Sequence, residues 1–478
     1  MIFNSIAFAV FLPVVFALYW LLHKRLWWQN LLVLVASYVF YGWWNWRFLI
    51  LIAFTSGCSY LSGLFTQPEN RSTVRKVALW GNIGVNLAIL GLFKYYDFFT
   101  AELAGLLGLS GDKLMLHLVL PVGISFYTFQ ALSYTIDVYK GKIKPTHDAV
   151  AFFAYISFFP QLVAGPIERA TNLLPQFQRQ RTFNYDQAVD GCRQILWGLF
   201  KKMVVADNCA VYVNTIFAQG GSPSSHLLAA VLFTFQIYGD FSGYSDIAIG
   251  TAKLFSINLM QNFRTPYFSR DIAEFWRRWH ISLTTWFRDY IYIPLGGSRV
   301  GKWKVMRNTF IIFLVSGLWH GANWTFIAWG FYHACLFLPL ILLGKNRKHT
   351  NMVATGRLLP SLKEFGQMTL TFVLVAIGWV IFRATSIPNM VNFFHEMLNP
   401  HALSALWKFF IAPAFPVARI SIIIMLIIEW LQRSKEHGLQ NADKIIRSRW
   451  LRYFLYALAL VSIIFFRGDY TEFIYFQF

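Results

Sequence analysis

Long apolar runs recur along this 478-residue chain and restrict its fold more than any other feature of the sequence. Hydrocarbon cannot hydrogen-bond a peptide backbone, so a segment that crosses a bilayer must form a helix of ~20 mostly apolar residues or a strand of a closed barrel. Hydrophobic residues make up 56% of the sequence and charged residues only 13%, a balance too apolar for a water-soluble protein of this size. We therefore predict an all-α, polytopic membrane protein.

The positions and lengths of these runs predict about eleven transmembrane helices, with the run 308–344 long enough to break or to cross twice. The candidate runs are 3–22, 31–42, 48–66, 78–100, 114–136, 150–167, 190–218, 226–250, 308–344, 367–385, 407–431 and 451–468. No Pro/Ser-rich linker, fixed-period repeat or low-complexity tract divides them. We therefore predict a single membrane domain over residues 1–478.

The formal net charge of +20 is explained by cytoplasmic loops, where Lys and Arg accumulate in membrane proteins, and it requires no nucleic-acid partner. Basic residues cluster at 24–25, 71–76 and 140–144, directly after the first, third and fifth apolar runs. The intervening loop 101–113 carries Glu102 and Asp112, as an outer loop should. This alternation predicts that the basic loops lie inside and the N-terminus outside.

The segment 264–307 is too polar to span a membrane and too aromatic to be an ordinary solvated loop. At helical spacing its apolar residues fall on one face, which predicts an amphipathic helix at the membrane interface. The apolar face consists of Ile272, Phe275, Trp276, Trp279, Leu283, Trp286 and Phe287, and the polar face of Glu274, Arg277, Arg278, Thr285 and Arg288. A simple anchor would explain this pattern. His280, however, lies on the apolar side, where an imidazole needs a specific partner.

His320 is the strongest candidate for a catalytic residue, since the stretch 309–343 around it contains no Asp, Glu, Lys or Arg. Gly317 and Gly321 flank it and allow either a close approach of another backbone or a local break. Asn323, three residues further on, would share its helix face and could orient the ring. A buried neutral imidazole can take a proton from an acceptor hydroxyl while that hydroxyl attacks an acyl thioester.

Metal and cofactor chemistry is not indicated by the sequence. On a straight helix His333 would be rotated by about 220° from His320, so the two imidazoles would point apart and form no zinc pair. The four cysteines are scattered without CxxC spacing. The sequence also lacks an HExxH motif, a GxSxG elbow, a P-loop and a dinucleotide fingerprint. We therefore predict no metal site and no bound cofactor.

Several charged residues interrupt the apolar runs 190–218 and 226–250, although charge at membrane depth is costly. For Lys201, Lys202 and Asp207 we favour internal pairing, close to an interface that long side chains can reach. For Asp240 and Asp246, pairing and a functional role remain equally open.

Seven segments follow one another in the order MIFNSIAFAVFLPVVFALYW, PVGISFYTFQALSYTIDVYKG, SFFPQLVAGPIER, FQIYGDFSGYSDIAIG, FWRRWHISLTTWFRDYIYIPLGG, SGLWHGANW and FIYFQF. Together they resemble the membrane-bound O-acyltransferase family over nearly the whole chain. The most similar branch is the bacterial one that contains the membrane subunits of alginate O-acetylation, and the D-alanyl transfer proteins of teichoic acid modification are more distant. Any single segment would be a weak indication, but the ordered set is highly specific.

The resemblance implies that His320 is the active-site histidine of the family and that His280 is the second histidine, in an RRWH-type motif. It also implies a ring of helices around a central tunnel, with interfacial and re-entrant helices. A cytoplasmic acyl donor, acetyl-CoA or an acyl carrier protein, would supply the acyl group, and a separate extracytoplasmic O-acetyltransferase would complete its transfer. We assign substrate contacts to Trp319, Asn323, Trp276, Arg277, Arg278, Arg288 and Asp289.

These features predict a multi-pass O-acyltransferase of the bacterial inner membrane, most simply for acetyl, that serves the O-acetylation of an exopolysaccharide, such as alginate, or of peptidoglycan. Transfer of D-alanine to teichoic acid is the alternative within the same class of enzyme. A non-catalytic transporter or scaffold would also tolerate broken helices and buried charges. Such a transporter has no general need for a titrating group at His320, and this separates the two classes.

The charge pattern predicts that position 72 lies on the cytoplasmic side of the membrane. In a variant without native cysteines, Ser72→Cys should resist an impermeant thiol reagent added to intact spheroplasts and react once the membrane is permeabilised. Glu102→Cys, in the predicted outer loop, is the control and should react in both cases. Labelling of position 72 in intact spheroplasts would reverse the predicted orientation.

Overall fold

The computed structural model describes residues 1–109, 114–403 and 416–476. These residues form α-helices, short 3-10 and π-helical segments and loops, and this part of the chain contains no strand, so the predicted all-α class is confirmed. The start of the candidate run 407–431, Asp112 of the predicted outer loop and the last two residues of FIYFQF lie outside the described residues.

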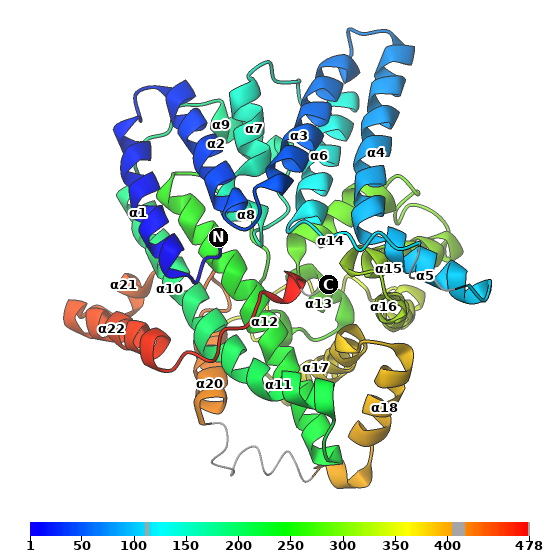
Figure 1. The fold of residues 1–478 in the computed structure, drawn as a ribbon. Helices are drawn as coiled ribbons and strands as arrows, with labels where there is room; N and C mark the ends of the chain where they lie inside the picture. The colour runs from blue at the N-terminus through cyan, green and yellow to red at the C-terminus, as the bar shows by residue number, and fades with distance from the viewer. Residues whose placement is uncertain (110–113, 404–415, 477–478) are drawn as a thin grey trace. The chain divides into compact units, whose positions relative to one another are not determined.

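The chain forms two compact units, which are described separately below (Figure 1). The first unit comprises Met1–Cys192 and Ala248–Met260, and the second comprises Arg193–Ile247 and Gln261–Phe478. Helices α10 (Tyr185–Leu199) and α12 (Pro223–Leu254) contribute residues to both. The single domain expected from the sequence stays a prediction.

The first unit is a bundle in which α3 packs against α4 and α6, and α2 packs against α7. Besides its parts of α10 and α12, this unit contains α1 (Ile6–Leu21), α2 (Leu26–Gly42), α3 (Arg47–Thr66), α4 (Ser72–Lys94), α5 (Tyr96–Leu106), α6 (Ile124–Tyr139), α7 (Ala149–Ser157), α8 (Phe159–Leu162) and α9 (Ala170–Phe177). Side-chain caps fix where several helices begin: Ser5 accepts a hydrogen bond from the Phe8 amide, and Asp148 accepts one from the Ala151 amide.

The second unit contains all of the predicted catalytic and substrate-contact residues. Its main helices are α11 (Asp207–Gln219), α13 (Ile272–Arg278), α14 (Ile281–Phe287), α15 (Lys302–His320), α16 (Trp324–Leu342), α17 (Leu362–Arg383), α18 (Ile387–Met397), α20 (Pro416–Leu431), α21 (Ala442–Ile445) and α22 (Arg449–Phe465). Short segments connect or extend them: η2 (Phe200–Ala206), η3 (Pro266–Phe268), η4 (Arg288–Tyr292), η5 (Pro400–Leu403) and η6 (Ile474–Phe476). Helix α16 packs against α15, α17 and α13.

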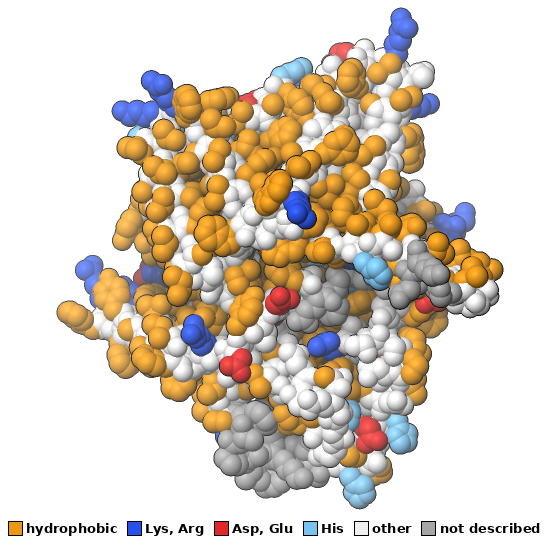
Figure 2. Space-filling model, viewed as in Figure 1, with side chains coloured by type: hydrophobic (Ala, Val, Ile, Leu, Met, Phe, Trp, Pro, Cys, Tyr) orange, Lys and Arg blue, Asp and Glu red, His pale blue; other side chains and the backbone are white. Residues whose placement is uncertain are grey.

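The outer surfaces of many helices are apolar, as expected for contact with lipid. Figure 2 shows hydrophobic side chains covering wide areas of the face in view. Helix α1, for example, exposes Val10, Val14 and Leu18. Among the described helices, α3, α4, α16 and α17 are long and apolar enough to cross a bilayer, and α1 is a shorter apolar helix. The chain is therefore a multi-pass membrane protein.

The long apolar run 308–344 forms a helical hairpin, and whether it crosses the membrane twice stays a prediction. Helix α15 ends at His320, and α16 begins at Trp324. A methyl group on Gly317 would lie 2.2 Å from the Phe326 carbonyl oxygen, and one on Gly330 would lie 2.3 Å from the Phe313 carbonyl oxygen. These two glycines therefore allow the backbones of α15 and α16 to meet directly.

The prediction of one amphipathic helix within 264–307 is wrong. Helices α13 and α14 are separate, because Trp279 is extended and His280 adopts a left-handed conformation with φ of 45°. The residues of the predicted apolar face are nevertheless all buried: Ile272, Phe275, Trp276, Trp279, Leu283, Trp286 and Phe287. Glu274 and Arg278, expected on the polar face, are buried as well, so most of α13 and α14 lies in the protein interior, while Arg277 and Arg288 are exposed.

We predict that the hairpin tolerates no side chain at position 330. Gly330→Ala should lower the free energy of unfolding by about 1–3 kcal/mol, because the new methyl group would overlap backbone atoms of α15. Gly366→Ala in α17 is the matched control, since no atom lies within 4 Å of its added methyl group. Unfolding of both variants in one detergent measures the difference, and equal stability of the two would contradict the close approach.

Candidate active site

His320 is enclosed by aromatic side chains at the end of α15. The helix stops there because Gly321 takes an extended conformation, and His320 is only 5% exposed. Its imidazole centroid lies 5.0 Å from the Trp319 ring, and 5.1 Å from each of the Trp329 and Phe382 rings. The ring therefore sits in apolar surroundings, where electrostatic interactions are stronger than in water.

Tyr475 approaches the same imidazole from the C-terminal segment of the chain. The centroid of its ring lies 5.6 Å from that of His320 and 6.3 Å from that of His280. The structure thus brings both predicted histidines to one tyrosine. Sequence reasoning missed Tyr475 as a site residue, although the motif FIYFQF that contains it had contributed to the family resemblance.

His280 is held in one orientation by Asn262. Its Nδ1 lies 3.1 Å from Asn262 Oδ1, and the same oxygen accepts hydrogen bonds from the Ser282 amide and the Ser282 hydroxyl. Because Oδ1 can only accept, Nδ1 of the neutral ring carries the proton and Nε2 carries the lone pair. Burial lowers the pKa of His280 to about 3, which keeps the imidazole neutral at physiological pH.

The left-handed backbone at His280 is uncommon for a residue other than glycine. Such conformations cost of order 1 kcal/mol and persist where the surroundings enforce them, often at functional sites. Here the Ile281 amide donates to the Asn262 carbonyl, and the Arg264 amide donates to the Arg278 carbonyl. The segment before α13 therefore pins the break between α13 and α14, and the break turns His280 inward.

Two tryptophan side chains, Trp319 and Trp329, each contact two histidines. Trp319 stacks edge-on against His320 and also approaches His280, with ring centroids 6.1 Å apart. Trp329 lies 5.1 Å from both His320 and His333. The expectation that His320 and His333 point apart on a straight helix therefore fails, because the hairpin turns α16 back along α15 and both histidines contact one indole.

Asn323 does not share a helix with His320, contrary to the prediction. It is the N-cap of α16, and its side-chain oxygen accepts a hydrogen bond from the Thr325 amide at 2.9 Å. Its amide nitrogen donates to the Thr385 carbonyl oxygen at 2.8 Å. The break at Gly321 places Asn323 in the turn, where it caps the next helix.

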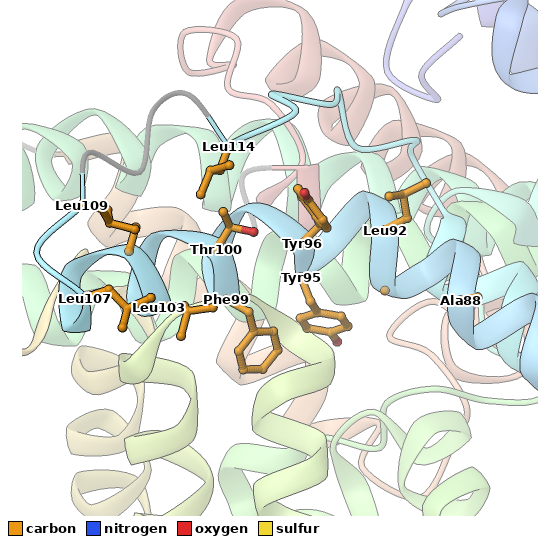
Figure 3. A pocket seen from close by; sticks show the side chains of 12 residues that line it. Ala88, Leu92, Tyr95, Tyr96, Phe99, Thr100, Leu103, Leu107, Leu109 and Leu114 are labelled. Atoms are coloured by element: carbon orange, nitrogen blue, oxygen red, sulfur yellow. The ribbon is translucent and has the colours of Figure 1, made fainter.

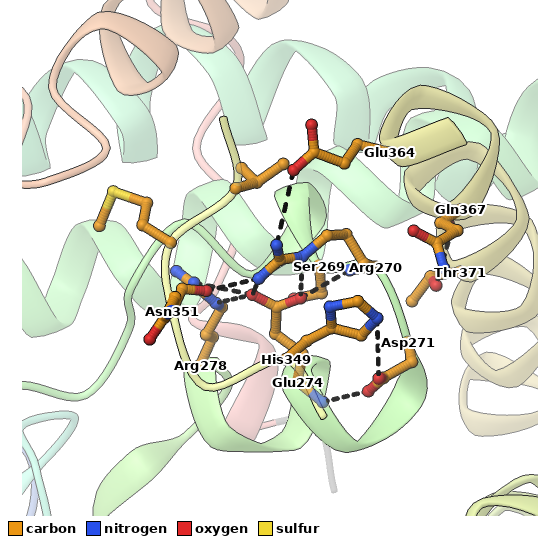
Figure 4. A network of polar contacts seen from close by, with 12 residues as sticks. Ser269, Arg270, Asp271, Glu274, Arg278, His349, Asn351, Glu364, Gln367 and Thr371 are labelled. Carbon is orange, nitrogen blue, oxygen red and sulfur yellow. Dashed lines mark hydrogen bonds and ion pairs between the residues drawn. The ribbon is translucent and has the colours of Figure 1, made fainter. Parts of the chain in front are cut away.

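The charged residues of α13 form a network around one carboxylate, Glu274 (Figure 4). Arg270 and Arg278 donate to it at 3.0 and 2.8 Å. Arg277 is exposed and donates to the backbone carbonyls of Asn346 and His349. Arg278 is therefore an internal partner of Glu274, whereas Arg277 keeps its charge at the surface.

The remaining predicted contacts divide between surface and interior. Arg288 is largely exposed and pairs with Asp289 at 2.7 Å, directly after α14. Trp276 lies inside, with its ring centroid 5.5 Å from Trp329 and 5.0 Å from His333. Trp276 therefore packs against Trp329, which in turn contacts His320.

An open pocket in the first unit is chemically different from this site. It has a volume of about 760 Å³ and lies along the end of α4 and the whole of α5 (Figure 3). Its lining is apolar apart from Tyr95, Tyr96 and Thr100, and it includes none of the predicted site residues. In the part of the chain that the structure describes, no three His, Cys, Asp or Glu side chains come together as metal ligands.

Two buried imidazoles lie beside one tyrosine and are enclosed by indole and phenyl rings in a multi-pass membrane protein, an arrangement that can accept and donate protons. Residues 142–365 match the membrane-bound O-acyltransferase family, MBOAT. The chain belongs to this family and is an O-acyltransferase. Both His280 and His320 lie within the matched region.

Full-length relatives extend the comparison to most of the chain. A Pseudomonas aeruginosa protein described as "probable alginate O-acetylase AlgI" is 43% identical over 84% of this chain and 75% of its own length. The peptidoglycan O-acetyltransferase of Helicobacter pylori is 34% identical over 84% of this chain and 81% of its own length. The teichoic acid D-alanyltransferase of Bacillus subtilis is 28% identical over 56% of this chain and 69% of its own length.

Proposed function

We propose that this protein serves the O-acetylation of a cell-surface polymer, an alginate-like exopolysaccharide or peptidoglycan, by moving an acetyl group from a cytoplasmic donor across the membrane. The relatives named for alginate and peptidoglycan O-acetylation support this polymer class, and the D-alanyltransferase match is weaker and shorter. The observation that carries the proposal is the contact between the buried His320 and the half-buried Tyr475. In this proposal the chain lies in the bacterial inner membrane, with about eleven crossings around a central tunnel.

In the proposed reaction His320 acts as the general base. It takes the proton of an acceptor hydroxyl while the hydroxyl oxygen attacks the carbonyl carbon of an acyl thioester. The new C–O bond forms, the C–S bond breaks, and the proton passes from His320 to the leaving thiolate, so no metal or redox partner is needed. The phenol ring of Tyr475 lies next to this base, so its hydroxyl can serve as the first acceptor of the acyl group.

His280 has a different part in this proposal. Its Nδ1 proton is committed to Asn262, so the ring presents a fixed lone pair at Nε2. A fixed acceptor next to Tyr475 can orient a hydroxyl, whereas His320 lies closer to the tyrosine ring, at 5.6 Å rather than 6.3 Å between centroids. We therefore assign positioning to His280 and proton transfer to His320.

The donor in this proposal is an anionic thioester, acetyl-CoA or an acetylated carrier protein, that approaches from the cytoplasm. Arg277 and Arg288 are two exposed cations, in α13 and directly after α14, that suit its phosphate groups. Arg278 is less suited, because it is buried against Glu274, whereas the side chain of Arg288 stays largely exposed although it pairs with Asp289. A separate extracytoplasmic O-acetyltransferase would then pass the acetyl group to the polymer.

Replacing His320 should abolish polymer acetylation without loss of the protein. In a host deleted for its own copy of the gene, His320→Gln should lower the acetyl ester content of the polymer by at least about 100-fold, the scale of a lost general base. The amount of protein in the membrane should stay near normal, because Gln retains a polar side chain of similar size. Substantial acetylation by a normally inserted His320→Gln protein would favour the transporter or scaffold.

Neutralising the exposed arginines should weaken donor binding. With purified protein and acetyl-CoA as the probe, Arg277→Gln/Arg288→Gln should raise KM about fivefold or more, the effect of about 1 kcal/mol, and leave kcat nearly unchanged. Wild-type kcat/KM should fall with added salt, and the double variant should lose much of this dependence.

Arg71→Gln, which removes an exposed charge from the loop before α4, is the control and should behave as wild type. The assay uses neutral detergent, so anionic lipid cannot contribute. Unchanged KM and unchanged salt dependence in the double variant would mean that Arg277 and Arg288 only anchor the segment. Turnover with an acetylated carrier protein and none with acetyl-CoA would identify the donor as the carrier.

A further inference from the structure

A cluster of buried charges in the second unit is not explained by the reaction itself. Lys202 is 0% exposed, and its Nζ lies 2.7 Å from Asp207 Oδ1 and 2.7 Å from Asp240 Oδ1. Buried ion pairs add little net stability, because desolvation of the charges offsets their attraction. A cluster of this kind therefore needs a reason other than stability.

The helix that carries Lys202 is built to turn two consecutive lysines inward. The segment η2 is π-helical, and both Lys201 and Lys202 are buried. Helix α12 packs directly on its backbone, since a methyl group on Gly239 would lie 2.9 Å from the Lys201 carbonyl oxygen. Short π-helical segments are rare and occur frequently at functional sites.

The Lys202 cluster holds the C-terminal segment of the chain. Lys202 Nζ donates to the Thr471 carbonyl oxygen at 3.0 Å, and Asp240 Oδ2 accepts a hydrogen bond from the Ile474 amide at 2.7 Å. The Gly468 amide donates to the Met203 carbonyl oxygen of η2 at 3.0 Å. Three backbone groups of the segment are thus fixed to η2 and α12, beside which Figure 1 draws the red end of the chain.

Tyr475 directly follows Ile474, the residue whose amide Asp240 holds. We propose that Lys202, Asp207 and Asp240 position Tyr475 beside His320 by anchoring the C-terminal segment. This inference rests on the proposed function, in which His320 is the base. Lys202 and the two carboxylates are positioning residues, because they act on the site through the backbone at 471 and 474.

The neighbouring ion pair provides a matched comparison. Lys201 Nζ lies 2.6 Å from Asp246 Oδ2 and donates to Ser242, and Asp246 also accepts from Gln194. This pair comes from the same π-helical segment and the same helix α12, and it is similarly buried. Its hydrogen bonds and ion pair lie within η2, α10 and α12, and its further electrostatic partner Glu429 lies in α20, so it does not serve as an anchor for residues 468–474.

The first experiment removes each pair in the full-length protein. Lys202→Met/Asp240→Leu should lower the acetyl ester content of the polymer about 100-fold, since misplacing a reacting group by about 1 Å has effects of this size. Hydrogen exchange of the purified protein should show lost protection of the amides at 468 and 474. The control Lys201→Met/Asp246→Leu should retain that protection and most of the acetylation. Native protection and near-normal acetylation in Lys202→Met/Asp240→Leu would overturn the proposal.

A second pair of variants leaves the buried charges intact, in case the first variant fails to fold. Ile474→Pro removes the amide that donates to Asp240, at the first position of η6, where proline is tolerated. Ile474→Val keeps the amide and removes one methylene group. We expect acetylation to fall about tenfold or more in Ile474→Pro and to stay within about twofold of wild type in Ile474→Val. Equal acetylation by the two variants would overturn the proposal.

His320→Gln separates this inference from the proposed function. If both hold, His320→Gln abolishes acetylation and keeps the protected amides at 468 and 474. If the proposed role of His320 fails, His320→Gln remains active, while the protection measured in the Lys202 and Ile474 variants still shows whether the segment is anchored. If only the anchor fails, His320→Gln is inactive and Lys202→Met/Asp240→Leu retains native protection and activity.

Discussion

The requirement that buried polar groups find partners determines much of this structure. Among apolar side chains an unpaired imidazole, carboxylate or ammonium costs several kcal/mol. His280 therefore bonds to Asn262, Glu274 lies between two arginines, and Lys202 lies between two carboxylates. Each of these partners comes from a different turn or a different element, so pairing also fixes how the elements meet.

Periodicity in the sequence predicted which residues are buried better than it predicted the backbone. All seven apolar residues chosen from 272–287 are buried, because an apolar side chain is driven from water whatever the helix geometry. The single helix drawn through them was wrong, since the left-handed turn at His280 depends on hydrogen bonds to the distant residues Asn262 and Arg264. A periodic pattern contains no information about such a break.

The candidate site was predicted in part for the same reason. His320 and His280 could be chosen because an imidazole in an apolar stretch is visible in the sequence itself, and the pairing favoured for Lys201, Lys202 and Asp207 is confirmed. Tyr475 could not be placed, because only the fold brings the end of the chain to α15. Asn323 was misplaced because the hairpin turn at Gly321 ended the helix one turn early.

The aromatic enclosure of His320 resolves a difficulty in using a buried imidazole as a base. Apolar surroundings favour the neutral ring and so oppose the positive charge that forms when it takes a proton. Ring centroids of Trp329, Phe382 and Tyr475 lie within 5.6 Å of the imidazole centroid, and an aromatic ring attracts a cation that lies over its face within ~6 Å. Such attraction is strongest when the imidazolium exists, which is during proton transfer. Rings whose faces meet the imidazolium would therefore stabilise the charged form of His320 in the transition state.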